Sequence, residues 1–148
     1  MLIQPTFDET LKKAGTLFLI ETVKLFSNFN YEIVVKDSKD KKNLRWSLHG
    51  LRAPELSMPA SGAAQFRKVY FDLKGTYAFT LQKIDGEENS FELRVLASSV
   101  SVKGTPRTPF VAIYTSPQIF EMNRSLESER PIRKPETRRG ADLNSTKK

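Results

Sequence analysis

The amino-acid sequence predicts a mainly β protein, an antiparallel β-sandwich or a small β-barrel, with a short N-terminal helix and a disordered basic C-terminal tail. Two observations favour strands: short runs in which every second residue is apolar, and frequent turn residues between these runs. A third observation defines the tail, because apolar residues become sparse after about Met122. We therefore expect one globular domain at residues 1–121 and a tail at residues 122–148.

The expected helix begins near Thr6. Thr6 and Glu9 have the S/T-x-x-E spacing of a capping box, and Gly15 is suited to end a helix. The next run, residues 16–26, alternates like a strand but also fits a continuation of the helix. We favour the strand, with Gly15 as the only stop signal.

The strand pattern is clearest in the middle of the chain. Apolar residues alternate with polar ones at residues 29–35, 44–48, 69–71, 77–81 and 91–95. A three-residue loop ending at Gly75 would pair Phe71 with Tyr77, and a turn at Asp85-Gly86 would pair Leu81 with Leu93. Residues 67–97 are therefore expected to form a three-stranded antiparallel meander. A last strand at residues 110–115 follows Pro106 and Pro109, which are typical of an edge.

The charge of the chain is concentrated in its tail. The net charge is +7, and residues 122–148 contain eight Lys/Arg against four Asp/Glu, so the tail carries +4 and the body only +3. A basic tail is attracted to nucleic acid, anionic membrane surfaces or acidic proteins.

Few residues of the chain are suited to catalysis. There is no cysteine, the only histidine is His49, and the seven glycines form no phosphate-binding loop. The acidic pairs lack the spacing of a calcium loop. We therefore expect no enzymatic activity, no cofactor and no metal site. The absence of cysteine, of a visible signal segment and of any long apolar run favours a cytoplasmic protein with no membrane span.

The remaining candidates are residues that would contact an anionic partner. Basic residues gather around one predicted loop, flank Phe66 and Tyr70, and recur as pairs in the tail. They are Lys36, Lys39, Lys41, Lys42, Arg45, Arg67, Lys68, Arg133, Lys134, Arg138 and Arg139. Cations beside aromatic rings are typical of surfaces that bind single-stranded nucleic acid, although the same residues also fit a solvated loop and a packed core.

Two functions follow from this reading. The first is a non-enzymatic binding or scaffold domain that recognises a protein partner through an edge strand or loops. The alternative is a nucleic-acid-binding barrel aided by the tail. A small barrel with a helical turn between its third and fourth strands resembles an OB-fold in outline. The generous aromatic content also leaves homo-oligomerisation open.

Overall fold

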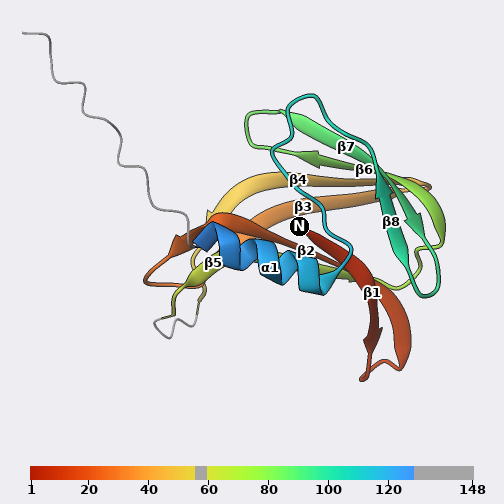
Figure 1. Ribbon diagram of the computed structural model, residues 1–148, viewed down its shortest axis with the longest axis horizontal. Helices are drawn as coiled ribbons and strands as arrows, with labels where there is room; N and C mark the ends of the chain where they lie inside the picture. The colour runs from red at the N-terminus through yellow and green to blue at the C-terminus, as the bar shows by residue number, and fades with distance from the viewer. Residues whose placement is uncertain (56–59, 129–148) are drawn as a thin grey trace, which may run out of the picture.

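The computed structural model describes residues 1–55 and 60–128 and places eight strands in one sheet (Figure 1). The strands are β1 (Leu2–Asp8), β2 (Lys13–Phe26), β3 (Glu32–Asp40), β4 (Asn43–Arg52), β5 (Gly62–Tyr70), β6 (Gly75–Gln82), β7 (Glu88–Val95) and β8 (Val100–Lys103), and the helix is α1 (Pro117–Ser128). Their order is β1-β2-β5-β3-β4-β6-β7-β8, and β8 approaches β1. The mainly β prediction is confirmed, in the form of a nearly closed, barrel-like sheet.

The predicted N-terminal helix is wrong, because β1 and β2 form an antiparallel hairpin there. The carboxylate of Asp8 accepts hydrogen bonds from the backbone N–H groups of Thr10 (2.9 Å) and Leu11 (2.8 Å). Lys12 then takes a positive φ of 52°. Polar residues that resemble a helix cap therefore form a β-turn instead. Residues 16–26, whose pattern fitted either a strand or a continuation of the helix, lie in β2.

The β3–β4 hairpin lies between β5 and β6, so the predicted meander is wrong. β5 pairs with β2 and β3, whereas β6 pairs with β4 and β7. The β5–β6 connection, residues 71–74, therefore passes the tip of the β3–β4 hairpin. The β3–β5 and β4–β6 pairings are parallel, which corrects the prediction of a purely antiparallel sheet.

The β6–β7 hairpin is present, but its register differs from the predicted one. Leu81 pairs with Asn89 rather than Leu93, because the turn is tight: Lys83 N–H donates to Glu87 O (2.8 Å) and Gly86 has φ +90°. The shift is an even number of residues. The alternate side chains therefore keep the faces expected for them.

The core lies inside the curved sheet and is rich in aromatic rings. Phe18 on β2, Trp46 on β4 and Phe79 on β6 are fully buried, and their ring centroids lie 5.6–5.9 Å from one another. Edge and tilted contacts of this kind add to the stabilisation that comes from burying the rings. Strands from three parts of the chain are joined by this cluster.

The segment after β8 closes the remaining side of the sheet. Asn89, which is 1% exposed, accepts a hydrogen bond from Phe110 N–H (2.9 Å) and donates to Thr108 O (3.2 Å). In place of the expected strand at 110–115 there is a single bridge, between Tyr114 and Leu2. Residue 121, the expected end of the globular domain, falls inside α1. Residues 129–148, with most of the predicted tail, lie outside the described residues.

Candidate functional site: a groove and a pocket

Most of the predicted basic contacts on the barrel are engaged with other parts of the chain. Lys39 forms an ion pair with Asp72, Lys68 with Asp37, and Arg45 with Glu88. Lys42 Nζ donates to Lys74 O (2.9 Å) and lies 4.4 Å from the Tyr77 ring centroid. In the described part of the chain, Lys36, Lys41 and Arg67 form no ion pair. The four tail cations, Arg133, Lys134, Arg138 and Arg139, lie outside the described residues.

Two of these lysines hold the β5–β6 connection against the hairpin tip. Lys39, at the end of β3, reaches Asp72 in the connection, and its hydrogen bond holds the pKa of Asp72 below the usual value. Lys42, in the turn, contacts both the end of the connection and β6. The lysine cluster seen in the sequence therefore has a structural role in the fold.

The two aromatic residues flanked by cations face the interior. Tyr70 is 6% exposed, and the Phe66 ring lies 5.0 Å from that of Trp46. A stacking platform needs exposed ring faces. The barrel thus does not combine these cations and rings into one open surface.

The single histidine does not join a metal-binding cluster in the described ranges. His49 is exposed on β4, and no cluster of three His, Cys, Asp or Glu residues suitable for a metal occurs in the described ranges. Among these same residues, no helix is long and apolar enough to cross a lipid bilayer.

A groove follows the junction of β3 and β5. Their ladder is a single pair, Glu32 with Gln65, in which Gln65 N–H donates to Tyr31 O (3.3 Å). Backbone groups alternate sides along a strand, so the N–H and C=O of Arg67 point to the same side as those of Gln65. The ladder does not extend that far within the described chain. The backbone edges of β3 and β5 are thus open beyond the pair.

This β3–β5 groove has a volume of about 910 Å³ and a positive lining. It is formed by residues 30–35 on one side and 61–63 and 65–67 on the other, with Leu25, Arg52 and Arg124. Glu32, the one carboxylate of the lining, is paired with Arg52 (2.6 Å). Arg67 forms no ion pair with any of the described side chains. Val34 and Leu25 add apolar surface.

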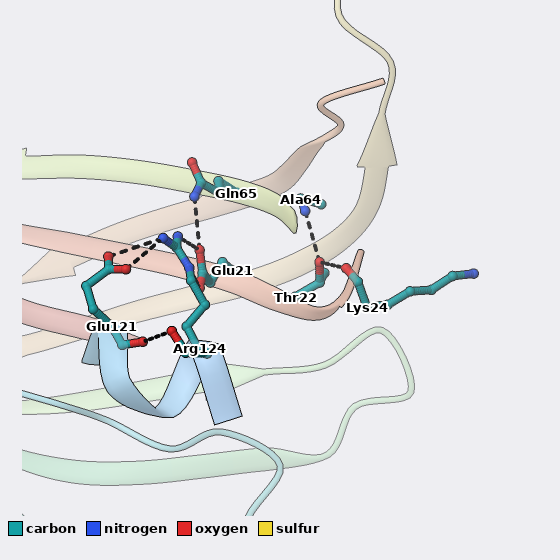
Figure 2. A network of polar contacts seen from close by, with 8 residues as sticks. Glu21, Thr22, Lys24, Ala64, Gln65, Glu121 and Arg124 are labelled. Carbon is teal, nitrogen blue, oxygen red and sulfur yellow. Dashed lines mark hydrogen bonds and ion pairs between the residues drawn. The ribbon is translucent and has the colours of Figure 1, made fainter. Parts of the chain in front are cut away.

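A second site lies under α1, where a buried carboxylate meets an arginine. Arg124 on α1 donates to Glu21 on β2 from Nε (2.8 Å) and Nη2, and Gln65 donates to the same carboxylate (2.9 Å), as Figure 2 shows. The Glu21 side chain is 9% exposed. Burial raises the pKa of Glu21, but the hydrogen bonds from Arg124 and Gln65 and the charge of Arg124 outweigh it and hold this pKa below its usual value. Glu21 therefore stays ionised and anchors the helix.

The pocket beside this ion pair has a volume of about 300 Å³ and is mostly apolar; we call it the α1 pocket. It is lined by β2, α1 and residues 110–112 and 114, together with Met1 and Ala63. The Met1 amino group donates to Ala112 O (2.8 Å), and burial, partly opposed by the charge of Glu21, lowers its pKa from 8.0 to about 6. At neutral pH the pocket thus holds one compensated ion pair and a largely uncharged amine.

The sequence pointed to neither Glu21 nor Arg124 as part of a site. Glu21 did interrupt the apolar alternation of residues 16–26, which was the one available signal. Arg124 lies 103 positions away and beyond the expected end of the domain. The sequence matches no family model, no curated protein and no solved structure.

Proposed function

We propose that this chain is a non-enzymatic protein-binding domain that holds an extended, acidic segment of a partner protein in the β3–β5 groove. The observation that carries the proposal is the single-pair ladder between β3 and β5. Two strand edges that share one pair and then remain open offer backbone hydrogen bonds to an added strand. The adjoining hollow of about 910 Å³ provides room for side chains.

The charge of the groove favours an acidic segment. Its lining includes the cations Arg52, Arg67 and Arg124 and one carboxylate, Glu32. Arg52 and Arg124 are held by carboxylates of this chain, whereas Arg67 has no such partner among the described residues. We therefore assign Arg67 the role of pairing with an acidic side chain, while Val34 and Leu25 contact apolar residues of the same segment. Alternating side chains of an extended segment suit such a mixed surface.

Selection from a random library of displayed 12-residue peptides tests this proposal. Selected peptides should be acidic with interspersed apolar residues, and they should shift backbone amide resonances of β3 and β5 in ¹⁵N spectra of the full chain. Arg67→Glu should weaken their binding at least tenfold, because it replaces attraction by repulsion. Lys13→Glu is the matched control, since Lys13 is an exposed cation outside the groove.

Two results would count against this function. Selected peptides could shift resonances on another surface and leave β3 and β5 unaffected. Alternatively, Arg67→Glu and Lys13→Glu could weaken binding equally, which would show a nonspecific charge effect.

A further inference from the structure

We infer that the α1 pocket binds a small, uncharged and mainly apolar molecule that carries one hydrogen-bond donor. The pocket adjoins the β3–β5 groove, since Leu25, Ala63 and Arg124 line both, but it is smaller and mostly apolar. Its volume of about 300 Å³ lies at the small end of natural ligand sites, which span about 300–1,000 Å³. A compact bicyclic or short-chain molecule fits this size.

The apolar side chains at the pocket explain why the ligand is mainly apolar. Val23 is 76% exposed and Leu25 is 57% exposed, although both lie on β2, which is buried near its middle. The register of β2 against β5 shifts between Glu21 and Leu25, which moves this part of the strand out of the regular ladder. A ligand in the pocket would cover apolar surface that the fold itself leaves open.

The electrostatics of the pocket explain why the ligand is uncharged. The carboxylate of Glu21 is neutralised by Arg124, which also contacts Glu121 (3.1 Å). A charged ligand would enter a mostly apolar space in which the nearest opposite charge is already paired, and it would lose its hydration without compensation. A neutral ligand avoids this cost.

Asn123 explains the single donor. Its Nδ2 donates to Ile119 O (2.9 Å), whereas its Oδ1 accepts no hydrogen bond from the described part of the chain. Asn123 is one of the α1 residues that line the pocket. A hydroxyl or N–H of the ligand can therefore donate to this Oδ1 and fix the orientation of the ligand.

The helix itself provides a route of entry. α1 is attached to the sheet by the Glu21–Arg124 ion pair and by Phe120, which is 5% exposed and lies 6.0 Å from the Tyr114 ring centroid. A small outward movement of the helix would open the space without disturbing the barrel core.

The test is a ¹⁵N chemical-shift titration of the full chain at pH 7 with three probes of one shape. 2-Naphthol is neutral and has a donor, 2-methoxynaphthalene lacks the donor, and 2-naphthoate is charged. 2-Naphthol should saturate the shifts of Val23, Leu25 and Asn123 with a dissociation constant of about 10 μM to 1 mM, as expected for a molecule of this size. 2-Methoxynaphthalene should bind about threefold to tenfold more weakly, and 2-naphthoate at least tenfold more weakly.

Two variants locate the site. Val23→Lys places a charge at the pocket and should weaken 2-naphthol binding at least tenfold. Ile84→Lys is the matched control, because Ile84 is 73% exposed and lies outside the pocket, and it should bind as the unchanged protein does. Arg67→Glu should also leave this binding unchanged, so failure of the groove proposal is distinguishable from failure of this one.

Three outcomes would overturn the inference. The first is the absence of saturable shifts at the pocket with 2-naphthol. The second is equal binding of 2-naphthol and 2-naphthoate. The third is equal loss of binding in Val23→Lys and Ile84→Lys, which would indicate nonspecific contact with exposed apolar side chains.

Discussion

Trp46 donates a hydrogen bond from Nε1 to the hydroxyl of Tyr70 at 2.9 Å, within the barrel. The two residues lie on β4 and β5, which are separated in the sheet by β3. Trp46 is fully buried, and burial raises the pKa of Tyr70, against the smaller opposing effects of the Trp46 hydrogen bond and of Lys68. The bond therefore joins β5 to β4 across β3, whose own ladder with β5 is a single pair.

Removing the hydroxyl should therefore destabilise the fold. Tyr70→Phe leaves the indole N–H of Trp46 buried without an acceptor, and we expect the free energy of unfolding to fall by about 1–3 kcal/mol. Urea unfolding followed by the fluorescence of the single tryptophan measures this change. Tyr114→Phe is the control, since no hydrogen bond of its hydroxyl is found in the described chain. Equal losses in the two variants would refute a special role for the Trp46–Tyr70 bond.

Gly15 is required by close packing in β2. A Cβ at this position would lie 2.8 Å from Val69 Cγ1 and 3.0 Å from the backbone oxygen of Tyr70. Because a backbone oxygen cannot turn away, Gly15→Ala should lower the free energy of unfolding by about 1–3 kcal/mol. In Gly62→Ala the new Cβ meets only the side-chain oxygen of Asn30 at 3.1 Å, so its loss should be smaller. Thermal unfolding measures the stability of both variants. Equal losses in Gly15→Ala and Gly62→Ala would contradict the role of close packing at Gly15.

The Glu21–Arg124 ion pair should control the attachment of α1. Glu21→Gln removes the charge that Arg124 contacts, and we expect a loss of about 1–2 kcal/mol and faster hydrogen exchange in α1. Glu121→Gln should have a much smaller effect, because the Glu121 side chain is 61% exposed. Mass-spectrometric hydrogen exchange distinguishes the two. Unchanged exchange in Glu21→Gln would mean that other contacts hold the helix.

The same pair predicts a pH dependence. Since the net effect of burial and hydrogen bonding is to lower the pKa of Glu21 below 4.5, the folded state favours the ionised carboxylate. Its stabilising contribution is complete well above pH 4.5 and is lost as the pH falls through the lower folded pKa. The stability difference between the unchanged protein and Glu21→Gln should thus shrink from pH 7 to pH 3 in urea titrations. A constant difference would show that ionisation of Glu21 contributes nothing.

Nucleic-acid binding, if present, should depend on the tail. The full chain with Arg133, Lys134, Arg138 and Arg139 changed to Gln should bind single-stranded oligonucleotides more weakly at low salt, with a smaller salt dependence. The triple variant Lys36→Gln, Lys41→Gln and Arg67→Gln should weaken binding less than the tail variant does, because these residues form no surface with exposed rings. Fluorescence anisotropy across a salt series measures both. Binding abolished by the triple variant would instead favour a basic face on the barrel.

Local patterns were enough to locate most strands and the inward faces of their side chains. Trp46, Phe79 and Leu93 are buried where the two-residue alternation placed them, because alternation reports directly which side of a strand meets the core. The left-handed backbone conformation of Gly75 also followed from local sequence. Its φ is +94°, although the hairpin expected there does not form. The prediction of an N-terminal helix was wrong because it rested on polar residues that are equally suited to a turn. The carboxylate of Asp8 can satisfy backbone N–H groups in a turn or in a helix cap, and nearby residues do not distinguish the two.

The mainly β class, the positions of the central strands and the scarcity of catalytic residue types followed from the sequence by itself, since composition and short-range periodicity determine them. Only the tertiary structure decided that the β3–β4 hairpin separates β5 from β6, that the clustered lysines hold the crossover, and that Glu21 meets Arg124. Strand order depends on which distant edges pair best when one common core is filled, and many orders preserve the same alternation. Both the groove and the α1 pocket arise between segments far apart in the chain, so no local pattern specifies them.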